Sequence, residues 1–139
     1  MRAERSPPAS VAGIARKGNL FFIARRGAGG ALGGKWEFPG GKVEDGEDAR
    51  AALIREFNEE FGLAVTVGSF LGSAVFAHRG VERPLYAHEV RFQGEPALRE
   101  HTAWKWASLA EIETLDFAGS DRLLLPALSA SPGIDAAAE

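Results

Sequence analysis

The chain has 139 residues, and 45% of them are hydrophobic, which is enough for one domain with a buried core. Its formal net charge of −3 argues against polymeric nucleic acid as a partner, because nucleic-acid-binding proteins normally carry a basic surface. The absence of cysteine excludes disulfides and thiolate metal sites, and no apolar segment reaches the length of a membrane span.

The first part of the chain predicts strands and a loop. Residues 1–9 are polar and contain prolines, so we expect a flexible arm. The apolar runs 11–15 and 20–24 are separated by a Lys-Gly-Asn turn signal, which favours a β-hairpin. Five glycines between residues 27 and 34 indicate a mobile loop, and residues 36–38 form a short predicted strand.

The rest of the chain completes an α+β pattern. Beyond a helix that begins near residue 45, we expect two long strands joined by a turn, a short strand and two helical segments, at residues 65–76, 85–92, 103–107, 108–112 and 121–129. Ser108 and Glu111 have the spacing of a capping box. We find no internal repeat, so we expect a single domain at residues 10–129 and a flexible tail at residues 130–139.

Residues 41–63 predict a turn followed by an amphipathic helix. Asp45 is the expected N-cap, and Glu47 and Asp48 would lie in the first turn, where the helix dipole favours acids. Gly62 followed by Leu63 predicts a Schellman ending. The apolar stripe that would face the core consists of Leu53, Phe57 and Phe61.

The other face of this helix carries three acids, Glu56, Glu59 and Glu60. At about 100° per residue they fall within roughly 100° of one another. Carboxylates this close repel each other unless cations lie between them, and hard oxygen ligands suit Mg²⁺ or Mn²⁺. The competing interpretation is an ordinary solvated face. The three acids therefore predict a divalent-metal site, and such sites commonly serve phosphate chemistry.

The same stretch resembles the Nudix box, with nine fixed positions in 23 residues. The matching residues are Gly41, Glu47, Arg55, Glu56, Phe57, Glu59, Glu60, Gly62 and Leu63. Residues 35–42, Lys-Trp-Glu-Phe-Pro-Gly-Gly-Lys, are similar to the MutT-like branch of this family, the nucleoside triphosphate pyrophosphohydrolases. The resemblance implies a Nudix-type α/β/α sandwich with a mixed β-sheet.

The resemblance also implies the ligands of Mg²⁺, for which Mn²⁺ can substitute. They would be Glu56, Glu59, Glu60, the backbone carbonyl of Gly40, and a further glutamate on a loop after the sheet. Glu100 is the expected loop glutamate. Glu95 competes with it, and Glu100 could instead be an exposed loop carboxylate.

Catalytic roles follow in the same way. Glu47 and Arg55 should form an ion pair that steadies the helix and orients Glu56. The base that takes a proton from the attacking water would be Glu56 first, and Glu100 second. Relatives in this branch attack the β-phosphorus, although nothing in this sequence alone fixes that position.

Four residues are candidates for contact with substrate. Arg26 and Arg83 would bind phosphate through their forked donors, or be plain surface charges. Phe38 would pack near the base, or be an ordinary core aromatic. Asp121 stands where the members of the branch that are specific for 8-oxoguanine carry an asparagine. An ionised aspartate only accepts hydrogen bonds, whereas asparagine also donates. An aspartate at this position, with Glu-His ahead of the last strand, resembles the CTP pyrophosphohydrolases of the same branch. Alternatively, Asp121 is the N-cap of the last helix.

The remaining histidines and tryptophans add little to this interpretation. His78, His88 and His101 form no pair at ligand spacing. Trp104 and Trp106 alternate along a predicted strand, so both should point to the core.

The resemblance implies Mg²⁺-dependent hydrolysis of a nucleoside or deoxynucleoside triphosphate, oxidised or otherwise modified ones included, to the monophosphate and pyrophosphate. Alternatives are hydrolysis of another nucleoside diphosphate-X substrate, such as a sugar nucleotide or a dinucleoside polyphosphate, and a non-catalytic nucleotide-sensing module. We expect a cytoplasmic monomer or homodimer that does not bind membranes, because the N-terminus has no apolar signal region.

Overall fold

The computed structural model describes residues 8–30 and 32–130 of the chain. The expected arm and tail lie almost wholly outside these residues. Eight strands form two sheets: β1 Ser10–Ile14, β2 Arg16–Lys17, β3 Leu20–Arg26, β4 Trp36–Glu37, β5 Gly40–Lys42, β6 Thr66–His78, β7 Val81–Arg91 and β8 His101–Ala107. The helices are α1 Ala49–Phe61, α2 Leu109–Thr114, α3 Gly119–Arg122 and α4 Leu125–Ala130.

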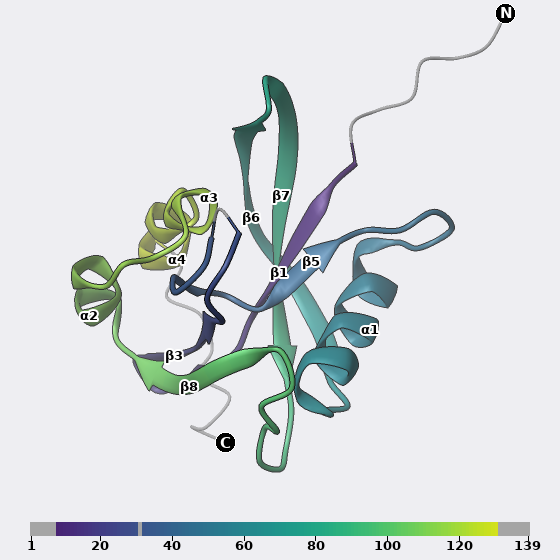
Figure 1. Cartoon of the computed structure of the whole chain (residues 1–139). Helices are drawn as coiled ribbons and strands as arrows, with labels where there is room; N and C mark the ends of the chain where they lie inside the picture. Colours follow the sequence, from purple (N-terminus) through teal and green to yellow (C-terminus); the bar gives the residue numbers. More distant parts are fainter. Residues whose placement is uncertain (1–7, 31, 131–139) are drawn as a thin grey trace, which may run out of the picture.

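The two sheets form the middle layer of the molecule. The first has the strand order β5-β1-β7-β6 and is mixed, since β1 and β7 run parallel and the other pairs are antiparallel. The second is antiparallel and is built around β3, with β8 on one edge and β2 and β4 on the other. Helix α1 covers one side of this layer and α2 to α4 cover the other (Figure 1).

Strand β3 lies in both cores, which explains how the two sheets share one layer. Phe21 and Ile23 pack into the cluster beneath α2 and α4, whereas Phe22 and Ala24 pack into the cluster beneath α1. Successive side chains of a strand point to opposite faces, so an uninterrupted apolar run suits a strand buried on both sides. The α+β fold in α/β/α layers is thus confirmed, with two sheets where one mixed sheet was expected.

The expected hairpin between residues 11–15 and 20–24 is present only in a shorter form. Residues 15–17 pair with the start of β3 around a turn at Gly18, and the Phe22 N–H donates to Ala15 O over 3.0 Å, whereas β1 pairs with β5 and β7. The reason is burial: Val11, Ala12 and Ile14 are all buried, and a strand with both faces covered belongs inside a sheet. The local turn signal was correct, but β1 pairs with the distant strands β5 and β7, so the hairpin is shorter than predicted.

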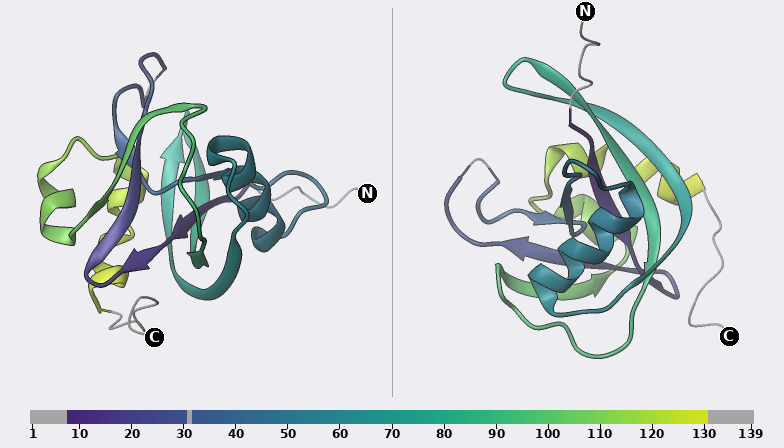
Figure 2. Two further views of the ribbon diagram at one scale, coloured as in Figure 1. Left: turned by 90° about the horizontal axis from the view of Figure 1, so that it is seen from below. Right: turned by 90° about the vertical axis from the view of Figure 1, so that its right-hand side faces the viewer.

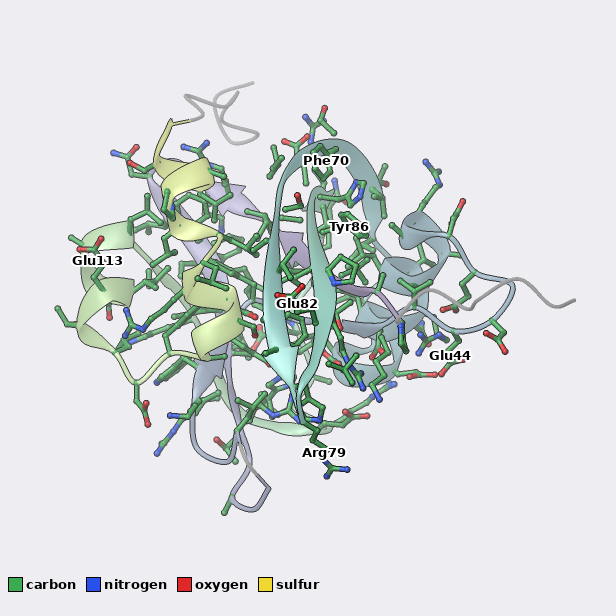
Figure 3. The ribbon with its side chains drawn as sticks, turned by 90° about the horizontal axis from the view of Figure 1, so that it is seen from above. Glu44, Phe70, Arg79, Glu82, Tyr86 and Glu113 are labelled. Carbon is green, nitrogen blue, oxygen red and sulfur yellow. The ribbon has the colours of Figure 1, made fainter. Side chains whose placement is uncertain are left out.

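The two long strands are confirmed and extend further than predicted. Strands β6 and β7 form a hairpin that curves along one side of the molecule (Figure 2). Arg79 and Gly80 at its tip both have positive φ, 53° and 77°, which is typical of a type I′ turn (Figure 3). Strand β8 begins at His101, two residues before the predicted start, and the expected helix 121–129 is divided into α3 and α4.

Helix α1 is confirmed, with a different N-cap. Asp48 caps the helix by accepting a hydrogen bond of 2.8 Å from the Ala51 N–H. Asp45 precedes a turn at Gly46, where φ is 83°, and therefore lies outside the helix. Glu47 is also outside, so the predicted acids of the first turn are absent there.

Helix α1 ends at Gly62 in the left-handed conformation, as predicted, but its hydrogen bonds are those of an αL ending rather than of a Schellman motif. Gly62 adopts φ of 67° and donates to Asn58 O, and the Leu63 N–H donates to Phe57 O. Leu53, Phe57 and Phe61 are buried, which anchors the helix and turns its acidic face toward β5. Within the described residues, no helix is long and apolar enough to cross a membrane.

Candidate active site

Helix α1 directs its three predicted carboxylates differently. Glu60 is only 6% exposed, and its Oε1 is buried with no hydrogen-bond partner among the described residues. The side chain of Glu56 is 15% exposed and shares a hydrogen bond with Glu60. Glu59 is 52% exposed, and its Oε1 lies 3.3 Å from Arg55 Nη1. Two acids therefore form a buried pair, and the third lies at the surface beside an arginine.

The buried pair is poor in positive charge. Burial, followed by the neighbouring Glu56, Glu37 and Glu100, raises the pKa of Glu60 to about 10. Burial also raises the pKa of Glu56, although Arg55 opposes this effect. Two acids this close, and desolvated, favour either a proton or a cation between them.

Arg55 connects the loop before α1 to the acidic face. It donates to both oxygens of Glu47, over 2.6 and 3.0 Å, and to the backbone oxygen of Lys42 over 3.0 Å. These bonds raise the pKa of Arg55 and lower the pKa of Glu47. Arg55 Nη1 also lies 3.2 Å from Glu56 Oε2. The contact expected between Glu47 and Arg55 is thus present, and it extends to Glu56.

The glycines of β5 allow this close packing. A Cβ at Gly41 would overlap the Glu56 carboxylate, so only glycine lets the strand approach that acid. A Cβ at Gly40 would instead overlap the carbonyl oxygen of Val11 on β1. Gly40 is therefore required by sheet packing in its own right.

A second charged cluster lies on the strands beside α1. Glu37 of β4 accepts from Arg26 Nη1 of β3 over 3.2 Å and contacts His101 Nε2 of β8 at 2.7 Å. The side chains of Glu37 and His101 are 9% and 3% exposed. Glu37 was not among the predicted site residues, and His101 was predicted to add little, so this contact was not foreseen. A charged residue between Trp36 and Phe38 in a buried strand was the signal that could have found Glu37.

Two cavities meet at Arg26. The first, of about 240 Å³, is lined by Glu60, Glu100, His101 and the glycine-rich loop. The second, of about 290 Å³, is lined by polar and apolar side chains that include Glu37, Phe38, Phe76, Leu85 and Asp121. Arg26 lines both. The structure thus brings Glu100 to the α1 carboxylates.

Glu95, the competitor of Glu100, lies elsewhere. It lines two other cavities, of about 480 and 680 Å³, together with Arg91 and Phe92. No α1 carboxylate is among the described residues that line either of them. Although these cavities are larger, the chemistry converges on the two cavities at Arg26.

Asp121 and Phe38 form the inner part of the second cavity. Asp121 Oδ2 accepts from the Phe38 N–H over 2.9 Å, and Ser120 Oγ donates to Oδ1 over 3.1 Å. Burial, with Glu37 nearby, raises the pKa of Asp121 to about 7. The alternative of an N-cap is wrong, because Asp121 lies inside α3, whose N-cap residue is Ala118.

The remaining candidates occupy different positions. Phe38 is 2% exposed and its ring packs on Phe21 and Phe117, so it is a core aromatic that also borders the cavity. Arg83 is half-buried on β7 and is not among the residues that line the cavity. It shares a sheet face with Leu85, which does line it, and its Nε is buried without a partner.

Trp104 and Trp106 lie on the face of β3 that is turned away from the second cavity. Trp104 and Trp106 both pack against Phe22, in the cluster beneath α1, which confirms their core position.

Comparison with known proteins identifies the family. Residues 5–128 match the family model described as the NUDIX domain. The chain belongs to the Nudix family. It is 38% identical over 121 residues to the CTP pyrophosphohydrolase of Escherichia coli (strain K12), which covers 86% of this chain and 90% of that protein. It is 34% identical over 105 residues to the 8-oxo-dGTP diphosphatase of the same strain, covering 75% and 81%.

Solved structures agree with this assignment. The solution structure of the E. coli ORF135 protein superposes with a TM-score of 0.80 at 37% identity, covering 88% of this chain and 89% of that one. The MutT protein of Methanosarcina mazei Go1 superposes with a TM-score of 0.79 at 23% identity, which supports the fold. This Nudix protein is therefore an enzyme of the MutT-type pyrophosphohydrolases.

The donors of the Nudix box fit a hard divalent ion. All of them are oxygens, and the buried Glu60 Oε1 has no hydrogen-bond partner in the part of the chain that the structure describes. As the side chains lie, no three acids or histidines among residues 8–30 and 32–130 converge closely enough to enclose a metal ion. Glu59 is held toward Arg55, so it would have to rotate to complete the set.

Proposed function

We propose that this enzyme hydrolyses a nucleoside or deoxynucleoside triphosphate, with Mg²⁺, to the monophosphate and pyrophosphate. The observation that carries the proposal is the buried pair of Glu56 and Glu60, with an oxygen that lacks a partner, beside a cavity lined by Arg26. A pair of acids that disfavours its own charge is suited to bind a cation. The activities named for the two E. coli relatives are consistent with this reaction.

The residues that would hold Mg²⁺ are Glu56, Glu59, Glu60, Glu100 and the Gly40 carbonyl. When bound, the ion would neutralise phosphate oxygens and lower the pKa of a coordinated water; Mn²⁺ would do the same. Glu60 and Glu100 already face one cavity, and Glu56 contacts Glu60.

Two glutamates can serve as the base. Glu56 is the first candidate, because Arg55 holds its carboxylate and β5 lies directly against it. It would take the proton of a water aligned with the phosphorus–oxygen bond that breaks. Glu100 is the second candidate, because it lines the same cavity as Glu60. Arg26, and Arg83 at the neighbouring sheet face, would orient the phosphates through their forked donors.

The nucleobase of the substrate would occupy the cavity that Phe38, Phe76 and Asp121 line. Glu37 and the ionised Asp121 are hydrogen-bond acceptors there, which favours a base with an exocyclic amino group, such as cytosine. When protonated, Asp121 also donates, as asparagine does, and its pKa of about 7 allows both forms near neutral pH. Cytidine triphosphates are therefore the first substrate class, and 8-oxoguanine triphosphates the second.

The rival functions are a different diphosphate substrate and a nucleotide sensor. Hydrolysis of a sugar nucleotide or dinucleoside polyphosphate would use the same carboxylates. A sensor would not need them, and every acid of the Nudix box is present here. We also propose that residues 10–129 act as a single domain, in the cytoplasm, on free nucleotides rather than on polymeric nucleic acid.

A substrate panel tests the proposal. The protein would be incubated with Mg²⁺ and CTP, dCTP, the other triphosphates, 8-oxo-dGTP, UDP-sugars and dinucleoside polyphosphates, and the products separated by ion exchange. We expect monophosphate and pyrophosphate from one or more triphosphates, and no product when EDTA is present. Turnover of UDP-sugars alone would replace the proposal by the first rival, and tight binding of nucleotide without turnover would replace it by the second.

A further inference from the structure

Three strands bring one side chain each to the wall between the two cavities. Arg26 on β3 pairs in register with His101 on β8, and β4 on the other edge of β3 carries Glu37. A register shift between Arg25 and Arg26 marks the place where β3 reaches this wall. The three residues are far apart in the sequence, so their meeting is a product of the sheet.

Glu37 is the centre of the cluster. Its Oε2 lies 2.7 Å from His101 Nε2, and its Oε1 and Oε2 lie 3.2 and 3.5 Å from Arg26 Nη1. A carboxylate only accepts, so His101 donates from Nε2. Both partners of this bond are buried, where a charge-assisted hydrogen bond is stronger than in water.

His101 is itself held from α1. Its ring stacks on Phe61, with centroids 5.0 Å apart and planes inclined by 15°. Its Nδ1 is buried without a hydrogen-bond partner, so within the described residues the polar contact of this ring is with Glu37. The imidazole is therefore fixed between the Nudix helix and the Glu37 carboxylate.

Arg26 needs such support because it has competing partners. Its side chain is 47% exposed, and it lines the same cavity as Glu60 and Glu100. A long arginine without an anchor would be attracted to those carboxylates, the same groups that would receive the metal. Glu37 offers the alternative, but only while its carboxylate stays oriented toward Arg26.

We propose that His101 is a positioning residue for substrate binding. By donating a hydrogen bond to Glu37, His101 keeps the Glu37 carboxylate turned toward Arg26. Arg26 is thereby kept between the first cavity, lined by Glu60 and Glu100, and the second cavity, lined by Phe38 and Asp121. This inference rests on the proposed function, since it assumes that Arg26 contacts the nucleotide. In this proposal His101 acts through Glu37 and Arg26.

Two substitutions separate the hydrogen bond from the packing of the ring. His101→Phe keeps a flat ring against Phe61 and removes the donor, whereas His101→Gln loses the ring and keeps a donor near the position of Nε2. His78→Phe and His78→Gln are the matched controls, because His78 is exposed at the end of β6. Arg26→Ala, alone and combined with His101→Phe, completes a double-mutant cycle.

The kinetic readout is KM against kcat for the triphosphate that the wild type hydrolyses fastest. We expect His101→Phe to raise KM about tenfold, with a smaller effect on kcat, as for loss of a charge-assisted hydrogen bond. His101→Gln should stay within about threefold of the wild type, and the two His78 variants should match it. In the Arg26→Ala background, His101→Phe should change KM by less than about twofold.

A second readout does not need turnover. In the free protein the NMR signal of the Arg26 Nε–H should shift in His101→Phe and remain in place in His101→Gln. An unmoved signal in His101→Phe, equal KM values for His101→Phe and His101→Gln, or multiplying effects with Arg26→Ala would overturn the inference. Should the wild type hydrolyse no triphosphate, the proposed function fails, while the NMR comparison still decides whether His101 positions Arg26.

Discussion

At the scale of single residues, the three glutamates on the acidic face of α1 have different roles in the site. Glu60 is buried beside Glu56, and Glu59 is exposed beside Arg55. The same residue type at neighbouring positions therefore has different consequences when it is substituted. Loss of Glu59 should affect chemistry alone, whereas loss of Glu60 should affect both chemistry and folding.

Glu59→Gln tests the first of these statements. We expect turnover to fall by roughly two orders of magnitude or more, because a metal ligand is lost. The thermal midpoint should change little, because the side chain is exposed and contacts only the surface arginine. Glu113→Gln on α2 is the control and should behave as the wild type, because Glu113 is exposed and lines neither cavity. Near-full activity of Glu59→Gln would remove Glu59 from the ligand set.

Glu60→Gln tests the statement that Glu60 affects folding, through the pH dependence of stability. The pKa of Glu60 in the folded protein, about 10, lies above its ordinary value of 4.5, so the folded state holds this proton more tightly. The stability that results is complete below about pH 4.5 and is lost as the pH rises toward 10.

Without metal, Glu60→Gln should therefore be more stable than the wild type at about pH 8.5, by several kcal/mol, and the difference should shrink toward about pH 5. Urea unfolding in EDTA measures it. Added Mg²⁺ should stabilise the wild type and leave the variant unchanged. A wild type that is the more stable protein at high pH in EDTA would contradict the account of the buried pair.

Asp121→Asn tests whether the second cavity selects the nucleobase. Asparagine can still accept from the Phe38 N–H, and it adds two donors toward the base. We expect the order of kcat/KM among triphosphates to change, with 8-oxo-dGTP gaining on CTP by about tenfold, and the fastest kcat to change less. Asp116→Asn, which alters an exposed ion pair with Lys35, should leave the order intact. An unchanged order for Asp121→Asn would make Asp121 a structural support of Phe38.

At the scale of elements, α1 was readable from the sequence because its signals are local. The apolar stripe, the glycine ending and the acidic face all follow from residues a few positions apart. The N-cap was misread because Asp45 and Asp48 are both good capping residues, and the intervening turn at Gly46 decides between them. Strand β1 was misplaced because its partners, β5 and β7, are distant in the sequence.

The choice between the two caps can be measured. Asp48→Ala should lower the free energy of unfolding by about 1 kcal/mol, because the Ala51 N–H loses its acceptor. Asp45→Ala should cost less than about 0.5 kcal/mol, as expected for a surface position. Urea unfolding of both variants gives the comparison. A larger loss for Asp45→Ala would restore Asp45 as the cap.

At the scale of the whole molecule, the site is an assembly of distant segments on one layer of strands. The box predicted Glu56, Glu59, Glu60 and their link to Arg55, since these lie within one helix and the turn before it. It could not predict that β3, β4 and β8 bring Arg26, Glu37 and His101 together, because strand pairing decides that contact. Glu100 was chosen over Glu95 by resemblance, and only the fold places it beside Glu60.

The central claim is that divalent ions bind at the acidic face of α1, between that helix and β5. Titration of ¹⁵N-labelled protein with Mn²⁺, which broadens nearby amide signals, tests it most directly. We predict that the signals of Gly40, Gly41 and residues 56–60 broaden first, together with Glu100, and that Glu60→Gln abolishes this effect. Broadening that begins instead around Arg91 and Glu95, with α1 unaffected, would contradict the account.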